Sequence, residues 1–225
     1  MLRHENKYII SLAAAEELRC RLRAILRPDA HAGPTGGYFI RSLYFDDIDC
    51  SAYHDKLAGV CDRAKWRIRF YNLDDSYIVL EKKEKFAGMT RKRSVRVDRP
   101  LAEAMTAGDF SACAAGKPLL REFHAEATAG LMTPRITVDY DRVPFVATAG
   151  NVRVTLDLGL RTMPRAPELF VSDAAALPVL MPGEAVLEVK YDDFLPEYIS
   201  AALECVPKAR SAVSKYCLCL AAVNG

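Results

Sequence analysis

Hydrophobic and polar residues alternate strictly over residues 61–72, CDRAKWRIRFYN. One set of alternate positions is apolar and consists of Ala64, Trp66, Ile68 and Phe70. The other set is entirely cationic and consists of Arg63, Lys65, Arg67 and Arg69. A period of two predicts a β-strand with one apolar face and one cationic face. Because four like charges on one face repel each other, that face is either wetted by solvent or holds a strongly negative partner.

The same reading along the chain predicts one α+β domain over residues 1–225, with about eight mainly antiparallel strands. The predicted strands are 2–10, 38–47, 61–72, 76–86, 89–98, 135–146, 151–162 and 185–192, with a turn at Gly88 before the fifth of them. Ser11 is a residue type that commonly caps the N-terminus of a helix, and the apolar residues after it have helical spacing. This pattern predicts a helix over 11–27 that ends before Pro28. Further helical segments are expected at 48–57, 100–130, 196–206 and 212–222, and a long Pro-rich loop at 163–184.

Charged residues recur at alternate positions on most of these strands. They include Lys7, Glu81, Lys83, Arg91, Arg93, Arg142, Arg153, Asp157, Glu188 and Lys190. One explanation is a sheet whose polar face meets water while its apolar face packs on helices. The other is a sheet curled into a closed barrel with the charged face inward. Buried charges need partners, so the second arrangement predicts a bound polyanion together with a metal ion, and we favour it.

Composition limits the partners. The net charge is only +2, so the chain is no polycation of the kind that coats nucleic acid. Its basic runs EKKEKF and TRKRSVR alternate with apolar residues, which favours strands over a nucleic-acid-binding arm. The seven cysteines form no CxxC pair, and neither a signal peptide nor an apolar run of about 20 residues is visible. We therefore expect a cytoplasmic domain without a membrane segment of its own.

Nine short motifs, in order over nearly the whole chain, carry a family resemblance: ENKY (5–8), SLYFDD (42–47), KWRIRFY (65–71), LEKK (80–83), TRKR (90–93), DYDR (139–142), VRVTLD (152–157), LEVKY (187–191) and SKY (214–216). This set resembles the VTC domain, the catalytic domain of the vacuolar transporter chaperone polyphosphate polymerases. The resemblance implies the triphosphate tunnel (CYTH-like) fold, a closed antiparallel eight-stranded β-tunnel with helices packed outside.

The resemblance also implies roles for individual residues. It assigns catalytic cations to Arg67, Arg69, Lys83, Arg142, Arg153 and Lys215. It assigns phosphate or nucleotide binding to Lys7, Arg91, Arg93, Tyr140, Lys190 and Ser214. A divalent ion, Mn²⁺ or Mg²⁺, would be held by Glu188 and Glu5. Such a set suits phosphoryl transfer, which needs positioning and charge neutralisation more than covalent help.

One departure concerns the opening motif. Tunnel-fold triphosphatases begin with Glu-x-Glu-x-Lys, whereas this chain has Arg3, Glu5 and Lys7 at the corresponding positions. The replaced carboxylate weakens a hydrolase and suits binding of a long anion. We therefore expect a polymerase that moves the terminal phosphoryl of ATP onto polyphosphate. A triphosphatase and a non-catalytic polyphosphate or nucleotide binder remain the alternatives. Export of the product would need a membrane partner that the sequence does not identify.

Overall fold

The computed structural model describes residues 4–86, 89–163, 169–172, 174–206 and 213–224. Its strands are β1 (His4–Ser11), β2 (Arg27–Pro28), β3 (Tyr38–Asp46), β4 (Arg63–Tyr71), β5 (Asp74–Phe86), β6 (Met89–Val97), β7 (Thr133–Ala147), β8 (Val152–Met163), β9 (Leu177–Pro178) and β10 (Glu184–Tyr191). Its α-helices are α1 (Leu12–Ile25), α2 (Ser51–Leu57), α3 (Arg99–Thr106), α4 (Pro118–Ala129), α5 (Glu197–Ala202) and α6 (Lys215–Asn224). Short 3₁₀ turns lie at Ser111–Ala115, Ala149–Asn151 and Leu203–Cys205.

The described strands form one ten-stranded sheet, and all of the pairings with a known register are antiparallel. Eight strands follow the order β1-β10-β8-β7-β3-β4-β5-β6, while the two-residue strands β2 and β9 pair with β7 and β8. The α+β class with a large antiparallel sheet is therefore confirmed. The closed eight-stranded barrel is not: the order begins at β1 and ends at β6 with no pairing between them among the described strands.

The chain divides into two compact units. Unit 1 is Met1–Phe39, Tyr140–Leu160 and Pro178–Ser214, and unit 2 is Ile40–Asp139, Arg161–Leu177 and Lys215–Gly225. Strands β3, β7, β8 and β9 contribute residues to both units. The expectation of a single domain over 1–225 remains a prediction.

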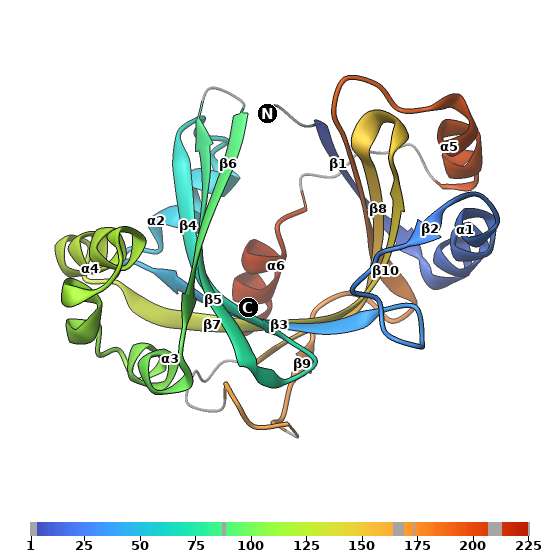
Figure 1. Ribbon diagram of the computed structural model, residues 1–225. Helices are drawn as coiled ribbons and strands as arrows, with labels where there is room; N and C mark the ends of the chain where they lie inside the picture. The colour runs from blue at the N-terminus through green and yellow to red at the C-terminus, as the bar shows by residue number, and fades with distance from the viewer. Residues whose placement is uncertain (1–3, 87–88, 164–168, 173, 207–212, 225) are drawn as a thin grey trace. The chain divides into compact units, whose positions relative to one another are not determined.

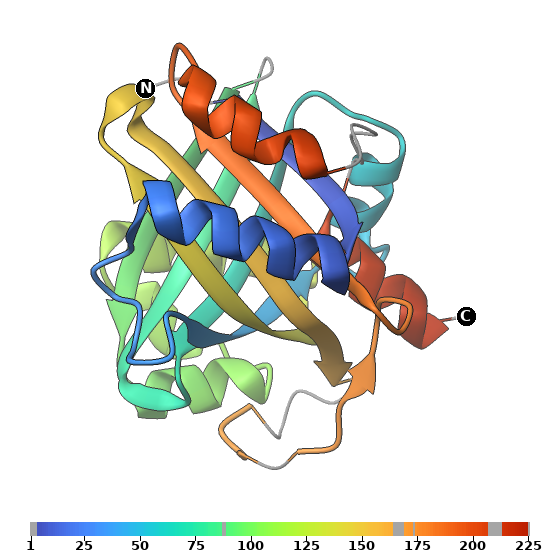
Figure 2. The same ribbon diagram turned by 90° about the vertical axis from the view of Figure 1, so that its right-hand side faces the viewer.

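Unit 1 has its core between the sheet and two helices. Figure 2 shows α1 and α5 lying across the same face of β1, β10 and β8. Leu18 and Leu22 of α1 are fully buried there against strand residues such as Val154 and Leu187. The helix begins where the sequence predicts, because the Ser11 side chain accepts a hydrogen bond from the Ala14 N–H at 3.1 Å. The opposite face of these strands is left for polar side chains.

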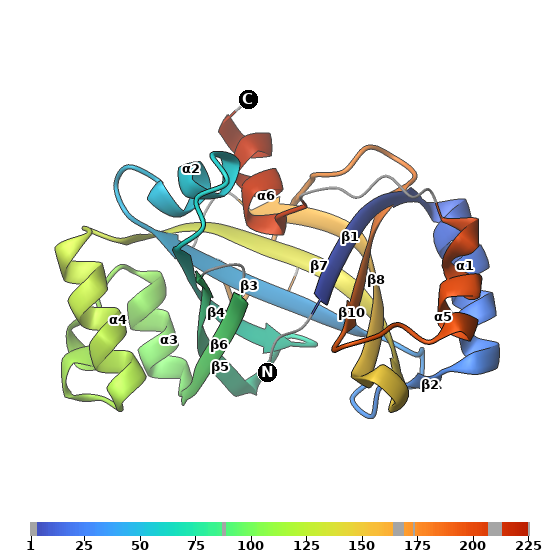
Figure 3. The same ribbon diagram turned by 90° about the horizontal axis from the view of Figure 1, so that it is seen from above.

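The strands of unit 2 likewise have one apolar face packed on helices and one polar face. The apolar side of β4, with Trp66, Ile68 and Phe70, is buried in a core that α3 and α4 complete, and Figure 1 shows these two helices beside β5 and β6. Figure 3 shows α2 next to α6, the helix that follows Ser214. The predicted alternation over 61–72 is therefore confirmed as β4, with its cations on the side away from this core.

Most predicted elements appear within a few residues of their expected ends. The helical region 100–130 consists of α3 and α4, separated by the 3₁₀ turn before the expected break at 116–118. The Pro-rich loop 163–184 includes the short strand β9. Arg3, the Gly88 turn and residues 164–168 lie outside the described residues. Within the described part of the chain, no helix has the length and hydropathy needed to cross a membrane.

A buried ion pair joins two strands of unit 2. Arg41 of β3 and Asp139 of β7 are only 2% and 1% exposed. The Arg41 Nε and Nη2 donate to the carboxylate of Asp139 at 2.8–3.1 Å, and Nη1 donates to the carbonyl oxygens of Leu169 and Val171 at 3.0 and 2.6 Å. One guanidinium therefore fixes both a strand pair and the segment that contains Leu169.

We expect Asp139→Ala to destabilise the protein by about 3–5 kcal/mol, because it leaves the Arg41 charge buried without its partner. Asp75→Ala is the matched control, since it removes a carboxylate from an exposed ion pair with Arg99, a kind of pair worth only about 0–1 kcal/mol. Urea denaturation of the purified variants measures both losses. Equal losses in the two variants would contradict the structural role of the buried pair.

Candidate functional site

The cationic side of β4 is part of a larger polar group in unit 2. We call it the β4 group and define it as Ser42, Tyr44, Lys65, Arg67, Arg69, Glu81, Lys83 and Lys92. Strand register explains its composition, because Tyr44 and Glu81 are the cross-strand partners of Arg67, and Ser42 is that of Arg69. Directly opposed residues in a sheet share a face. These side chains therefore converge on the side of β4 away from the core.

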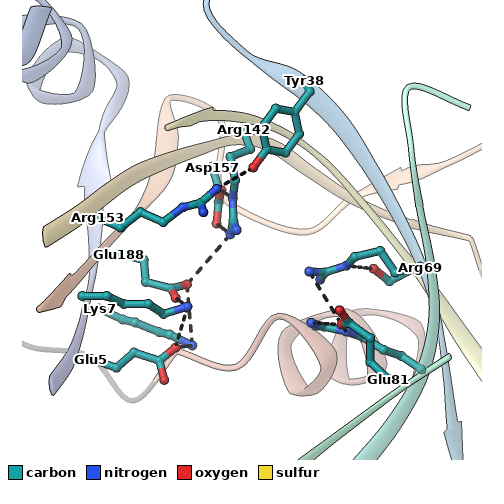
Figure 4. Close-up of polar contacts among 12 residues, drawn as sticks. Glu5, Lys7, Tyr38, Arg69, Glu81, Arg142, Arg153, Asp157 and Glu188 are labelled. Atoms are coloured by element: carbon teal, nitrogen blue, oxygen red, sulfur yellow. Dashed lines mark hydrogen bonds and ion pairs between the residues drawn. The ribbon is translucent and has the colours of Figure 1, made fainter. Parts of the chain in front are cut away.

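Glu81 is the carboxylate around which the β4 group is organised. Its side chain is 2% exposed, and its Oε2 accepts from Arg67 Nε at 2.7 Å and faces Arg67 Nη2 at 2.6 Å. Its other oxygen lies 3.0 Å from Lys92 Nζ, and Arg69 Nη1 lies 4.0 Å from Oε2 (Figure 4). Burial alone would raise the pKa of Glu81, but Arg67, Arg69 and Lys92 outweigh burial and hold that pKa far below its usual range. Glu81 is therefore a permanent negative charge that three cations share.

Two hydroxyl groups hold the arginine side chains in place. Arg67 Nη1 donates to the Tyr44 hydroxyl at 2.8 Å, and Arg69 Nε donates to Ser42 Oγ at 3.0 Å. Burial raises the pKa of Tyr44, yet the positive charges of Arg67 and Arg69 reverse this and leave it below its ordinary value. Both guanidinium groups are thus fixed in orientation before any ligand arrives, which is the property that positioning of a phosphate requires.

Lys65 lies at the edge of the β4 group. Its Nζ is 3.5 Å from Cys217 Sγ and 4.7 Å from the centre of the Tyr216 ring, both on α6. Burial lowers the pKa of Lys65, and the Cys217 thiol opposes this lowering. A lysine in such surroundings gains from a nearby anion, because the anion favours its charged form.

On β6 the structure corrects the expected register by one position. Arg93 lies on the side of α4, where its guanidinium pairs with Glu84 and Glu122 at 2.5–3.1 Å, and Arg91 shares that face by strand alternation. Lys92 instead contacts Glu81. Arg93 is thus part of an ion-pair network outside the β4 group, and Lys92 takes the place expected for Arg91 and Arg93. The prediction was wrong because Arg91 and Arg93 share their strand face with Val95 and Val97, which belong to the core of unit 2.

Unit 1 carries a second polar group on the face of its strands away from α1 and α5. We call it the β10 group and define it as Glu5, Lys7, Tyr140, Arg142, Arg153, Thr155, Asp157, Glu188 and Lys190. Two rows cross β1, β10 and β8 in register: Lys7–Glu188–Thr155 and Glu5–Lys190–Arg153. Opposite charges therefore face each other between β1 and β10, whereas on β8 Glu188 faces a hydroxyl and Lys190 faces another cation.

The two glutamates of the β10 group share the same lysines. Lys7 Nζ lies 3.1 Å from Glu5 Oε1 and 3.9 Å from Glu188 Oε2. Lys190 Nζ pairs closely with Glu188 Oε1 and lies 3.8 Å from Glu5 Oε1. In Figure 4 the side chains of Glu5, Lys7 and Glu188 point toward one another. Glu188 and Glu5, which the resemblance assigns to a metal, are therefore neighbours in space.

Arg142 is held by a forked pair with Asp157. Its Nε and Nη2 donate to the two oxygens of the fully buried Asp157 at 2.6 and 2.8 Å, and its Nη2 lies 3.9 Å from Glu188 (Figure 4). Burial would lower the pKa of Arg142, but Asp157 and other nearby groups raise it well above its ordinary value. The Arg142 guanidinium also lies 5.2 Å from the centre of the buried Tyr140 ring. Tyr140 thus packs against the arginine that it precedes by two positions.

Arg153 has two partners that the sequence did not suggest. Its Nη2 donates to the Tyr38 hydroxyl at 2.9 Å and lies 2.9 Å from the buried carboxylate of Asp29. Burial raises the pKa of Asp29, whereas hydrogen bonds from His31 and the charge of Arg153 bring it below its ordinary value. Asp29 lies in a loop directly after Pro28. Because loop residues follow no periodic pattern, the sequence could not predict that Asp29 pairs with a residue of the sheet.

Lys83, Ser214 and Lys215 complete the predicted set. Lys83 follows the alternation of Glu81 on β5 and is paired in register with Lys65. Ser214 immediately precedes α6, Lys215 is the first residue of that helix, and both are half-buried. The residues that sequence reasoning missed, Lys92 and Tyr44 above all, stood on strands already predicted. Strand alternation could have found Tyr44, which shares a face with Ser42.

The oxygen donors of the β10 group fit a divalent ion whose remaining ligands come from a bound phosphate. Among the described residues, no cluster of three or more His, Cys, Asp or Glu side chains could hold a metal by itself. Glu188 and Glu5 provide carboxylate oxygens, the donors that Mg²⁺ and Mn²⁺ prefer, and such ions are commonly held by one or two carboxylates together with substrate phosphates. The residues present therefore fit an ion that arrives with, or is completed by, a phosphate ligand.

Comparisons with known proteins identify the family. The chain resembles HpAC1 from Hippeastrum, a protein assigned as an adenylyl cyclase with a dominant triphosphatase activity, at 17% identity and a TM-score of 0.60, over 99% of this chain and 96% of that one. It resembles a protein from Bacillus halodurans assigned as an adenylate cyclase at 12% identity and a TM-score of 0.51, over 91% and 88%. At these identities the likeness shows a common fold. No curated protein sequence matches. The sequence model of the VTC domain matches residues 2–224, nearly the whole chain, and the chain therefore belongs to the VTC domain family.

Proposed function

We propose that this chain is a metal-dependent polyphosphate polymerase that transfers the terminal phosphoryl group of ATP to a polyphosphate chain. Membership of the VTC domain family supports a reaction on triphosphate-like substrates. The single observation that carries the proposal is that Arg67, Arg69 and Lys92 gather around one buried carboxylate, Glu81. Tyr44 and Ser42 hold the two guanidinium groups in orientation. Fixed guanidinium donors on one face suit the binding of phosphate oxygens.

The β4 group would bind the phosphates. Phosphoryl transfer proceeds with charge spread over the phosphoryl oxygens, so positioning and electrostatic stabilisation supply most of the catalysis. Tyr44 and Ser42 fix the orientation of Arg67 and Arg69. The two arginines would donate hydrogen bonds to phosphate oxygens, and a guanidinium in such a fixed geometry binds phosphate more strongly than a lysine does. Lys65, Lys83 and Lys92 would add charge without a fixed orientation.

The β10 group would hold the divalent ion. Its cations are nearly matched by Glu5, Asp157 and Glu188, so its need for an anion is smaller and its supply of oxygen donors is larger. Glu188 and Glu5 would hold Mn²⁺ or Mg²⁺, which when bound polarises phosphoryl oxygens as a Lewis acid. Lys7, Arg142, Arg153 and Lys190 would then bind the phosphates that accompany it, with Tyr140 packed against Arg142.

Several parts of the proposal rest on the resemblance alone. These are the closed tunnel, the phosphate-binding roles of Ser214 and Lys215, and ATP rather than another nucleotide as the donor. A cytoplasmic location, expected from the sequence composition, also belongs to the proposal. A product chain that fills a tunnel would also keep water from the transferring phosphoryl group. Nucleic acid is not part of the proposal, because the net charge is only +2.

A triphosphatase is the second candidate. The observation in its favour is the common fold with HpAC1, the protein with a dominant triphosphatase activity. The two reactions share the phosphate-binding groups and differ in the acceptor, which is water in one and polyphosphate in the other. A protein that binds polyphosphate without turnover is the third outcome that the experiments below can give.

The first prediction concerns the faces of β4 and β6. Arg67→Ala and Lys92→Ala each remove a cation from the β4 group, whereas Arg93→Ala, the matched control, removes one from the opposite face of β6. We expect Arg67→Ala to weaken tripolyphosphate binding by about 1.5–3 kcal/mol, the range for charge-assisted hydrogen bonds. Lys92→Ala should weaken it by a smaller amount, and Arg93→Ala should leave it unchanged. Isothermal titration calorimetry measures all three, and a loss in Arg93→Ala alone would show that the opposite face binds phosphate.

The second prediction concerns Glu188. Glu188→Gln keeps the size of the side chain and removes its charge. We expect turnover of ATP with Mn²⁺ to be lost, while metal-free binding of tripolyphosphate stays equal or becomes tighter because a negative charge has left an anion site. Glu184→Gln, on the same strand but outside the β10 group, is the control that should keep full turnover. Full activity in Glu188→Gln would exclude this residue from the reaction.

The third prediction distinguishes the candidate reactions by their products. With ATP, Mn²⁺ and a short polyphosphate primer, a polymerase yields phosphate polymers on a gel together with stoichiometric ADP. A triphosphatase acting on ATP instead yields ADP and free orthophosphate without polymer. Binding of tripolyphosphate without either product would leave a non-catalytic binder. Only the first outcome agrees with the proposal.

A further inference from the structure

Thr155 of β8 has a buried hydroxyl group that the fold does not use. The residue is 3% exposed, and among the described residues its Oγ1 has no hydrogen-bond partner. A buried hydroxyl without a partner costs about 1–3 kcal/mol. Valine has nearly the same shape and would avoid that cost. Something other than packing within the strand therefore has to account for an oxygen atom at this position.

The position of Thr155 in the sheet places that oxygen in the β10 group. Its neighbours Val154 and Leu156 belong to the core of unit 1, so strand alternation directs Thr155 to the opposite face. Its cross-strand partner on β10 is Glu188. Side chains of directly opposed residues have Cβ atoms about 4.5–5.5 Å apart. Asp157 and Arg153 flank Thr155 on the same face of β8.

An unpartnered hydroxyl is not by itself a site, and Thr137 shows why. Thr137 of β7 is equally buried and its Oγ1 also lacks a partner. Asp139, two positions further along the same strand face, accepts three hydrogen bonds from Arg41 and belongs to a structural ion pair. Thr155 differs because its cross-strand partner is Glu188, which lies among Lys7, Arg142 and Lys190 in the β10 group. The unpartnered hydroxyl therefore faces a carboxylate of the proposed metal-binding group across one strand pair.

We propose that Thr155 Oγ1 is a further protein ligand, beside Glu188 and Glu5, of the divalent cation that acts with the phosphates. The inference rests on the proposed function, because it assigns a further ligand to the same ion. Hydroxyl oxygen is a hard donor suited to Mg²⁺ and Mn²⁺, and phosphate-binding loops use a Ser or Thr hydroxyl for Mg²⁺ in the same way. The ion would give the Thr155 oxygen the partner that the protein lacks.

The experiment measures Mn²⁺ binding rather than activity. Full-length wild type, Thr155→Val, Thr155→Ser and the matched control Thr137→Val are titrated with Mn²⁺ in the presence of tripolyphosphate, and free Mn²⁺ is followed by electron paramagnetic resonance. Thr155→Val should weaken Mn²⁺ binding by about tenfold or more, a loss typical of removing a group that supports a metal. Thr155→Ser, which keeps the hydroxyl, should stay within about threefold of wild type, and Thr137→Val should bind as wild type does.

Stability and metal-free binding separate a ligand from a structural residue. Without metal, Thr155→Val should unfold in urea at the same or a higher midpoint, because it removes a buried polar group that has no partner. It should also bind tripolyphosphate as wild type does. Thr155→Ala provides a second test of Mn²⁺ binding if the valine variant does not fold. Unchanged Mn²⁺ affinity in the Thr155 variants, or an equal loss in Thr137→Val, would overturn the proposal.

The same titration distinguishes failure of the Thr155 assignment from failure of the proposed polymerase activity. If wild type binds Mn²⁺ through Thr155 but makes no polymer from ATP, the ligand assignment stands and the polymerase does not. If wild type with tripolyphosphate binds no Mn²⁺, the ligand assignment fails. Polymer formation in a Thr155→Val variant with normal Mn²⁺ affinity would keep the polymerase and remove Thr155 from the metal site.

Discussion

Repulsion between cations on neighbouring positions of a sheet is the constraint on which both polar groups depend. Two unit charges about 4 Å apart near a protein surface repel by about 4 kcal/mol, and β4 alone carries four cations on one face. The protein limits this repulsion with a few buried carboxylates placed inside the groups. Glu81 serves Arg67, Arg69 and Lys92, and Asp157 holds Arg142 in a fork. Without these carboxylates the guanidinium groups would turn toward solvent, and the sheet would lose its fixed donors.

The carboxylates are arranged differently in the two groups. In the β4 group Arg67, Arg69 and Lys92 gather around one buried carboxylate, Glu81, an arrangement that favours an added anion. In the β10 group the carboxylates approach the cations in number, and Glu188 lies among Lys7, Arg142 and Lys190. This difference suggests a division of labour between phosphate binding and metal binding. It follows from charge placement within each group and needs no assumption about how the two units are arranged.

Much of the fold could be predicted from the sequence, because the signals are local. The alternation over 61–72 and the Ser11 cap depend on neighbouring residues, and both are confirmed. The same alternation placed Arg67 and Arg69 on one face. The prediction was wrong for Arg93, because alternation within β6 puts it on one face with the core residues Val95 and Val97, where it pairs with Glu122. The partners of the cations could not be predicted either: Asp29 reaches Arg153 from a loop more than a hundred residues earlier in the chain.

The carboxylate partners also explain how the cations can bind phosphate without leaving their positions. A guanidinium has five N–H donors, and the fork between Arg142 and Asp157 uses two of them. Arg142 can therefore keep Asp157 and still donate to a phosphate oxygen. Arg67 is similar, since Glu81 and Tyr44 fix its orientation through particular N–H groups. An incoming phosphate then meets donors whose rotamers are already fixed, so less side-chain entropy is lost on binding than for a flexible lysine. In the proposed phosphate-binding surface the buried acids would thus not compete with the substrate; they would hold in place the cations that bind it.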